Sequence, residues 1–157
     1  MKFIKLSIIT LLIINAQGCT KESIEKVAVS KSTKELLQAN EWVMTAYTVH
    51  PGIIISGDTV TDYFTVIDDC DKDGFVKFTN YDTIIYNRGN IKCLPNEDKE
   101  DYTRYILNND TSMTEYYPSF SIDYTIKSIN ENSLECTFET NEQNQKRLNT
   151  FKFEKRK

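Results

Sequence analysis

Few side chains in this chain of 157 residues could carry catalysis or bind a metal: it has one histidine, His50, and four cysteines. Zinc-protease motifs and two-histidine metal or haem sites need more than one histidine, so the sequence excludes them. No serine in a nucleophile elbow and no other activated nucleophile accompanies His50. We therefore expect a protein that is not an enzyme and needs no cofactor.

An acidic segment, residues 69–74, matches the first half of an EF-hand calcium loop. Asp69, Asp71 and Asp73 stand at loop positions 1, 3 and 5. The second half does not fit, because Asn80 replaces the bidentate glutamate at position 12 and a strand is predicted where a helix should follow. We favour a solvated acidic turn and keep calcium binding by the three aspartates as the alternative.

The composition is that of one compact, acidic domain. Hydrophobic residues make up 39% of the chain and charged residues 27%, with a formal net charge of −4. Lys and Arg form no basic stripe, which a nucleic-acid binder needs in order to replace the counterions of phosphates. We therefore exclude nucleic acid as a partner. The sequence indicates no particular protein partner.

The first nineteen residues have the pattern of an export signal. Lys2 and Lys5 form a positive start, residues 6–14 are mostly apolar, and the small Gly18 precedes Cys19. The apolar run is about half of the roughly 20 residues that a membrane-spanning helix requires. A cleaved signal is therefore favoured over a permanent transmembrane helix.

Ala16-Gln17-Gly18-Cys19 resembles the lipobox of bacterial lipoproteins, although Ala16 and Gln17 stand where that motif usually has Leu and then Ala or Ser. The resemblance implies cleavage before Cys19 and a diacylglycerol group on its thiol, and cleavage by an ordinary signal peptidase is the alternative. Thr20–Lys31 is polar and typical of a tether. We therefore expect a signal peptide (1–18), a lipidated tether (19–31) and a folded domain (32–157).

The residue after the lipidated cysteine bears on where the protein is anchored. Thr20 is not the Asp that often marks retention at the inner membrane. Two or three acyl chains hold a protein on a bilayer where one chain would be marginal. We therefore expect an exported protein whose lipid anchors it to a Gram-negative membrane, and specifically to the outer membrane.

Beyond the tether, the sequence predicts one short helix and then a sheet. Ser32 and Glu35 have the spacing of a capping box, which starts a helix. From Trp42 onward, short runs alternate between apolar and polar residues and are separated by turn residues, the pattern of a half-buried antiparallel sheet. The predicted strands are residues 41–49, 59–67, 75–79, 83–87, 102–107, 112–117, 121–129, 134–140 and 149–154.

Turn sequences rich in Asn and Asp, such as 80–82 and 108–110, join consecutive runs as hairpins. An up-and-down meander of about eight strands closes most simply into a small barrel, which removes exposed edges. The inward positions of the alternating strands are then expected to form an apolar interior of Trp42, Phe78, Tyr105, Leu107, Tyr124, Ile126, Phe138 and Phe151.

Over residues 35–154 the chain resembles the lipocalin-like domain of bacterial surface lipoproteins. The resemblance rests on Leu36-Leu37, Trp42, Asp69–Asp73, Phe78, Cys93 and Tyr124-Thr125-Ile126. The chain departs from the family at Asn40, where the family usually has Gly two residues before the Trp. The resemblance implies an all-β fold, a small antiparallel lipocalin-like barrel, in a family whose ligands are mostly unassigned.

The resemblance also pairs a cysteine in an acidic turn with one after the next hairpin, here Cys70 and Cys93. In an oxidising compartment this pair is expected to form a disulfide. Cys136 shares its strand face with Leu134 and Phe138, so we favour a buried small side chain over a reactive thiol.

For function, the resemblance favours binding of a small apolar ligand. It places Ile53, Ile54 and Ile55 where a lid would close the barrel, whereas the β propensity of this run favours an ordinary edge or buried strand. Trp42, Tyr105 and Phe151 are the interior residues expected to contact a ligand. The main alternative is an interaction or structural module with a filled barrel, ranked ahead of an enzyme. An apolar cavity of roughly 300 Å³ or more would favour a ligand.

Overall fold

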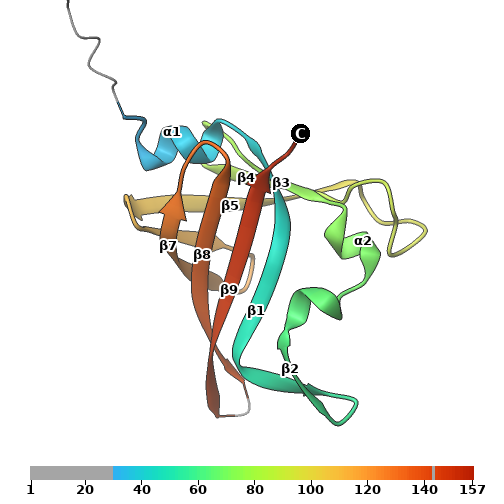
Figure 1. Ribbon diagram of the computed structural model, residues 1–157. Coiled ribbons are helices and arrows are strands. Elements are labelled where there is room, and N and C mark those ends of the chain that lie inside the picture. The colour runs from blue at the N-terminus through green and yellow to red at the C-terminus, as the bar shows by residue number, and fades with distance from the viewer. Residues whose placement is uncertain (1–29, 143) are drawn as a thin grey trace, which may run out of the picture.

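The computed structural model describes residues 30–142 and 144–157, which form one antiparallel sheet (Figure 1). Its strands are β1 (Glu41–Ile55), β2 (Asp58–Asp62), β3 (Phe75–Phe78), β4 (Thr83–Asn87), β5 (Glu100–Asn109), β6 (Ser112–Tyr116), β7 (Ser121–Ile129), β8 (Ser133–Glu142) and β9 (Gln145–Lys155). The helices are α1 (Thr33–Gln38), the 3-10 turn η1 (Tyr63–Thr65) and α2 (Asp69–Lys72). None of the helices in this part of the chain has the length and apolar character to span a membrane.

The sheet closes into a barrel because its first and last strands pair. The strands follow one another as neighbours from β3 to β9, and β1 pairs with β9 from Trp42↔Lys155 to His50↔Leu148. β1 and β3–β9 thus form the closed wall. β2 pairs with β1 at Thr48 and at residues 53–55, and forms with the end of β1 a hairpin arm that extends from the barrel (Figure 1). The predicted all-β, up-and-down barrel of about eight strands is confirmed.

The wall is weakest between β1 and β3, a junction we call the β1–β3 seam. Only two residue pairs join these strands, Glu41↔Lys77 and Trp42↔Val76. Beyond Trp42, β1 follows β9, and residues 56–74, which we call the crossover segment, bridge the gap with β2, η1 and α2 (Figure 1). Side chains and the crossover segment, rather than strand hydrogen bonds, therefore complete the wall at this seam.

The helix α1 covers one end of the barrel (Figure 1). The predicted capping box is present: the Glu35 amide donates to the Ser32 hydroxyl, and the Ser32 amide donates to the Glu35 carboxylate at 2.7 Å. Leu37 is fully buried, and the Trp42 indole N–H donates to its carbonyl oxygen at 2.9 Å. The capping box thus stabilises the start of α1. The buried Leu37 on the apolar face of this helix closes this end of the core.

The predicted interior is confirmed. Six of its eight residues are buried, and Leu107 and Phe151 are half-buried against the same cluster. The cluster also contains Leu37, Ile84, Met113, Leu134 and Cys136. The alternation of the strands therefore predicted the correct face of the sheet.

The strand predictions need their largest corrections at two strands, while β9, predicted as 149–154, begins earlier, at Gln145. The predicted strand 59–67 ends at Asp62, because the chain turns into η1, where the Val66 amide donates to the Tyr63 carbonyl and the Thr65 hydroxyl to the Asp62 carbonyl. The predicted strand 41–49 continues to Ile55, because β2 supplies a second partner after β1 leaves β9.

Leu37→Ala is expected to lower the free energy of unfolding by about 2–5 kcal/mol, because it leaves a cavity beneath α1. Leu148→Ala is the matched control: Leu148 is 42% exposed, and its loss should cost at most about 0.5 kcal/mol. Urea denaturation followed by circular dichroism measures both. Equal costs for the two variants would mean that α1 does not close the core.

Candidate ligand-binding site

A cavity of about 470 Å³ lies inside the barrel and reaches the β1–β3 seam. At the seam it is bounded by Met44 and Tyr47 of β1, and across the gap by Cys70 and Phe75. Its inner wall is made of buried core side chains, mostly apolar: Trp42, Phe78, Ile84, Met113, Tyr124, Leu134 and Cys136. The short pairing of β1 with β3 therefore leaves open space behind a side-chain wall.

The inner wall contains one buried acidic side chain, Glu115 of β6, which is 1% exposed. Its Oε1 accepts hydrogen bonds from the hydroxyls of Tyr86 and Thr103, each at 2.6 Å. Its Oε2 accepts one from the Tyr124 hydroxyl at 3.2 Å. The four residues come from four consecutive strands, β4 to β7, so the antiparallel pairing of neighbouring strands brings them together.

The tyrosines around Glu115 are held in their neutral form. Burial, and then the negative charge of Glu115, raise the pKa of Tyr86 and Tyr124 well above the ordinary value for a tyrosine. The same two causes raise the pKa of Tyr117 to about 12. At neutral pH Tyr86 and Tyr124 therefore keep their hydroxyl protons and donate hydrogen bonds to Glu115.

Charged side chains of both signs line the cavity, but acids predominate. Asp71, Glu97, Asp101 and Glu115 are the acidic residues, and Arg88 is the basic one. Arg88 pairs with Asp101 and, at 3.6 Å, with Glu97. Within the described ranges no ion pair includes Glu115. Among the described lining residues, the one basic side chain is thus paired with two acids other than Glu115.

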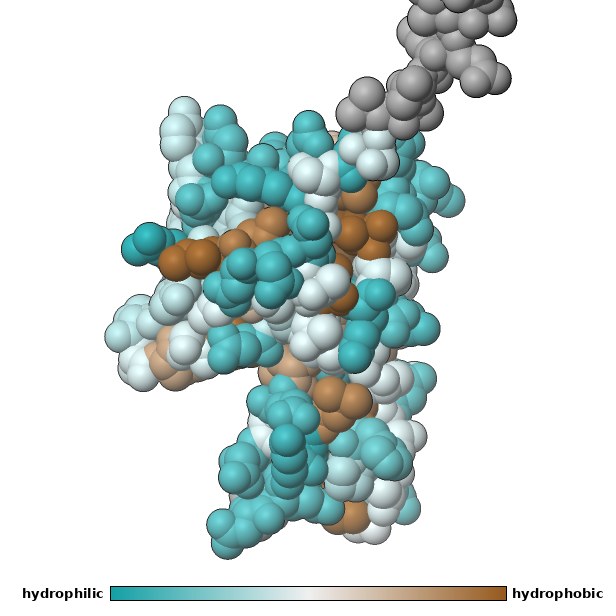
Figure 2. Space-filling model, turned by 90° about the vertical axis from the view of Figure 1, so that its left-hand side faces the viewer, coloured by the Kyte–Doolittle hydropathy of each residue, from teal (hydrophilic) through white to brown (hydrophobic). Residues whose placement is uncertain are grey.

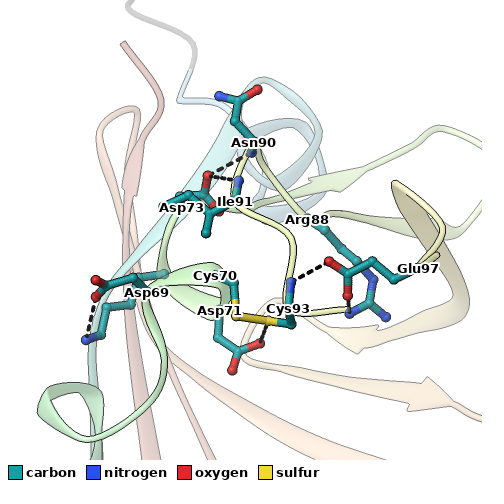
Figure 3. Close-up of a disulfide and its surroundings, with 10 residues drawn as sticks. Asp69, Cys70, Asp71, Asp73, Arg88, Asn90, Ile91, Cys93 and Glu97 are labelled. Carbon is teal, nitrogen blue, oxygen red and sulfur yellow. Dashed lines mark hydrogen bonds and ion pairs between the residues drawn. A yellow bond between two sulfur atoms is a disulfide. The ribbon is translucent and has the colours of Figure 1, made fainter. Parts of the chain in front are cut away.

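The disulfide Cys70–Cys93 is present and joins α2 to the loop that follows β4 (Figure 3). Beside it, Oδ2 of Asp73 accepts hydrogen bonds from the amides of Asn90 and Ile91 at 2.7 and 2.9 Å. Gly89 permits this approach, since it has a φ of +69° and an added Cβ would overlap the Asp73 carboxyl group. The disulfide and the Asp73 hydrogen bonds therefore hold the crossover segment against the loop after β4, at the cavity entrance.

The structure does not gather the three aspartates of the calcium alternative. Asp69 pairs with Lys72 at 3.4 Å, Asp71 lies beside Cys93, and Asp73 holds the loop amides (Figure 3). In the part of the chain that the structure describes, the one group with metal-ligand proximity is Cys70, Asp71 and Cys93. Its two sulfur atoms are bonded to each other, so the cluster is a disulfide beside a carboxylate.

The predicted ligand-contacting residues separate into two groups. Trp42 and Phe151 line the cavity, whereas Tyr105 is fully buried beneath α1, where its hydroxyl accepts a hydrogen bond from Gln38 at 3.1 Å. Residues 53–55 lie in the hairpin arm outside the cavity lining, and Ile54 is 67% exposed. Their role as a lid stays a prediction. Cys19 and the signal peptide (1–18) lie outside the described residues.

Glu115 and its hydroxyl partners were not predicted from the sequence. A signal for Glu115 was available, because it is two residues after Met113 in a predicted strand and therefore shares its inward face. A charged residue in an inward position is unusual enough to mark a site. No local pattern marks Tyr86 and Thr103, whose meeting with Glu115 depends on the register of three strands.

The comparisons with known proteins find similarity at the level of structure. No family model matches the chain, and the comparison with curated proteins found no match. Among solved structures, the chain is similar to bovine odorant binding protein in complex with a selenium-containing odorant, with a TM-score of 0.46 and 12% sequence identity. The match covers 82% of this chain and 74% of that one.

Alkylation should distinguish the three cysteines of the folded domain. Cys136 is 2% exposed, and burial, with the charge of Glu115 as the second cause, raises the pKa of its thiol to about 12. Iodoacetamide at pH 8 should therefore modify Cys136 only after denaturation, and non-reducing peptide mapping should recover Cys70 bound to Cys93. A disulfide that contains Cys136, or modification of the native protein, would contradict this arrangement.

Proposed function

We propose that the barrel binds a small, mainly apolar molecule in the cavity between β1 and β3. The observation that carries this proposal is the cavity itself, whose volume of about 470 Å³ lies within the usual range of ligand pockets. A barrel whose only role is structural gains stability when side chains fill it, because an empty apolar cavity forfeits packing contacts. A ligand restores those contacts.

The outer surface supports the same choice over an interaction module. On the face shown in Figure 2, hydrophobic residues form separate brown patches between polar ones. Exposed large hydrophobic side chains come from distant elements, among them Ile54 of β1, Leu94 of the loop before β5 and Phe120 of the β6–β7 turn. Ile91 lies in the same loop as Leu94, and Tyr116 is next to the turn that holds Phe120, so the exposed residues form small groups. Small apolar groups are normal on a protein surface and do not favour an interaction module.

A neutral fluorescent probe, N-phenyl-1-naphthylamine, is expected to bind the domain with micromolar or better affinity. Met44→Trp should weaken binding about tenfold or more, equivalent to about 1.4 kcal/mol, because the larger side chain occupies the cavity. Fluorescence titration measures the affinity, and circular dichroism verifies that the variant is folded.

Ile54→Trp is the control for this measurement, since it adds the same side chain to the same strand outside the cavity lining. Unchanged binding in the control would confine the site to the cavity, and weaker binding would favour a lid role for the hairpin arm. Absence of saturable binding by the wild-type protein would favour the interaction module.

We also propose that the domain is held on a membrane by a lipid on Cys19, at the outer membrane of a Gram-negative cell. The support is the pattern of residues 1–19 and the polar tether that follows, together with the resemblance to surface lipoproteins. The tether of twelve residues, 20–31, would reach at most roughly 40 Å when extended. A barrel on such a tether would sample ligands close to the membrane surface.

Detergent partitioning and intact mass of the protein from Gram-negative cells test the anchor. The wild-type protein should enter the detergent phase with a mass that includes a diacylglycerol, because two or three acyl chains bind membranes strongly. Cys19→Ser should remain in the aqueous phase. A wild-type protein with an unmodified N-terminus other than Cys19 would show instead a freely soluble exported barrel.

A further inference from the structure

The inward carboxyl group of Glu115 lacks a positively charged partner. Buried acidic side chains are normally paired with a base or a metal ion, because removal of the charge from water is costly. Glu115 is 1% exposed, and the one basic residue of the cavity lining, Arg88, pairs with Asp101 and Glu97. Within residues 30–142 and 144–157, only hydroxyl groups contact the Glu115 oxygens as hydrogen-bond donors.

The hydrogen bonds leave Glu115 able to accept one more donor. A carboxylate has two oxygens with about four acceptor sites. Oε1 uses two of them in short bonds from Tyr86 and Thr103, both 2.6 Å. Oε2 has one longer bond of 3.2 Å from Tyr124, which is weaker than a usual O–H···O bond of about 2.7–2.8 Å. Oε2 thus has the capacity for a further, stronger donor.

The rest of the cavity favours a cation with an apolar body. Its described lining contains four acids and one base, so acidic groups outnumber basic ones there. Aromatic rings from several strands line it as well, including Trp42, Phe78 and Phe151, and the faces of such rings attract cations. An aliphatic or aromatic ligand body would contact these rings and Met113, which lies two residues before Glu115 on the same strand.

We propose that the cavity selects small apolar molecules that carry a protonated amine, with Glu115 as the residue that binds the ammonium group. This inference rests on the proposed function, since it names the class of ligand for the same cavity. The ammonium group donates to Glu115 Oε2, supplies the missing positive charge and leaves the hydrocarbon part among the apolar side chains. A hard metal ion fits less well, because it requires about six oxygen ligands and the surrounding wall is mostly apolar.

Three ligands of one shape test the charge preference on the wild-type protein: 4-phenylbutylamine, 4-phenylbutan-1-ol and 4-phenylbutyrate. Calorimetry or displacement of N-phenyl-1-naphthylamine at pH 7 gives their affinities. The amine is expected to bind at least about tenfold more tightly than the alcohol, since charge-assisted hydrogen bonds are roughly twice as strong as neutral ones. The carboxylate should bind most weakly.

Two variants assign the preference to Glu115. Glu115→Gln keeps the size of the side chain and removes its charge, so the preference for the amine over the alcohol should disappear while the neutral probe still binds. Glu139→Gln, the same substitution at an exposed acid of β8 that pairs with Lys146 outside the cavity lining, is the matched control and should keep the preference. Because the ligand series is measured on the wild-type protein first, the test holds even if Glu115→Gln fails to fold.

The outcomes separate the two proposals. Equal affinity for the amine and the alcohol, or a preference that survives in Glu115→Gln, would overturn the amine inference while the cavity remains a binding site for the neutral probe. No binding of the neutral probe or of any of the three ligands would overturn the proposed function and this inference with it.

Discussion

The pairing of β1 is the constraint on which this barrel depends. Along Trp42–His50 the strand pairs with β9 and closes the wall, but it shares only two residue pairs with β3. A longer β1–β3 pairing would complete the wall with backbone hydrogen bonds and leave the crossover segment no gap to span. The gap is instead covered by that segment, which the Cys70–Cys93 disulfide holds against the loop after β4. The pairing of β1 therefore explains both how the barrel closes and why its interior can be reached at the β1–β3 seam.

Glu115 gives this interior its chemical character. For stability alone, an apolar side chain at its position would serve as well or better, because a buried charge without a partner is destabilising. The hydroxyls of Tyr86, Thr103 and Tyr124 offset part of that cost and fix the orientation of the carboxyl group. What they do not supply is positive charge. A positively charged ligand would pair with the buried carboxylate of Glu115. Relief of the cost of burying that charge would then add to the binding energy.

Local sequence patterns predicted the barrel and its apolar face, because alternation in a strand depends only on neighbouring residues such as Leu134, Cys136 and Phe138. The capping box of α1 is local for the same reason. The site depends on strand register and on where β1 leaves β3, which are properties of the whole sheet. Tyr86 and Thr103 meet Glu115 only after three strands are aligned, and no short pattern contains that information. The η1 turn was missed because its residues, Tyr63–Thr65, have strand-like composition.

A crystal structure of the protein with 4-phenylbutylamine tests the account most directly. The ligand nitrogen is expected to lie within about 2.7–3.2 Å of Glu115 Oε2, with the phenyl ring among the apolar residues of the cavity. The same crystals soaked with 4-phenylbutan-1-ol should show lower occupancy at this position. An amine bound only at the exposed acids near Arg88, or a cavity filled by rearranged side chains, would contradict it.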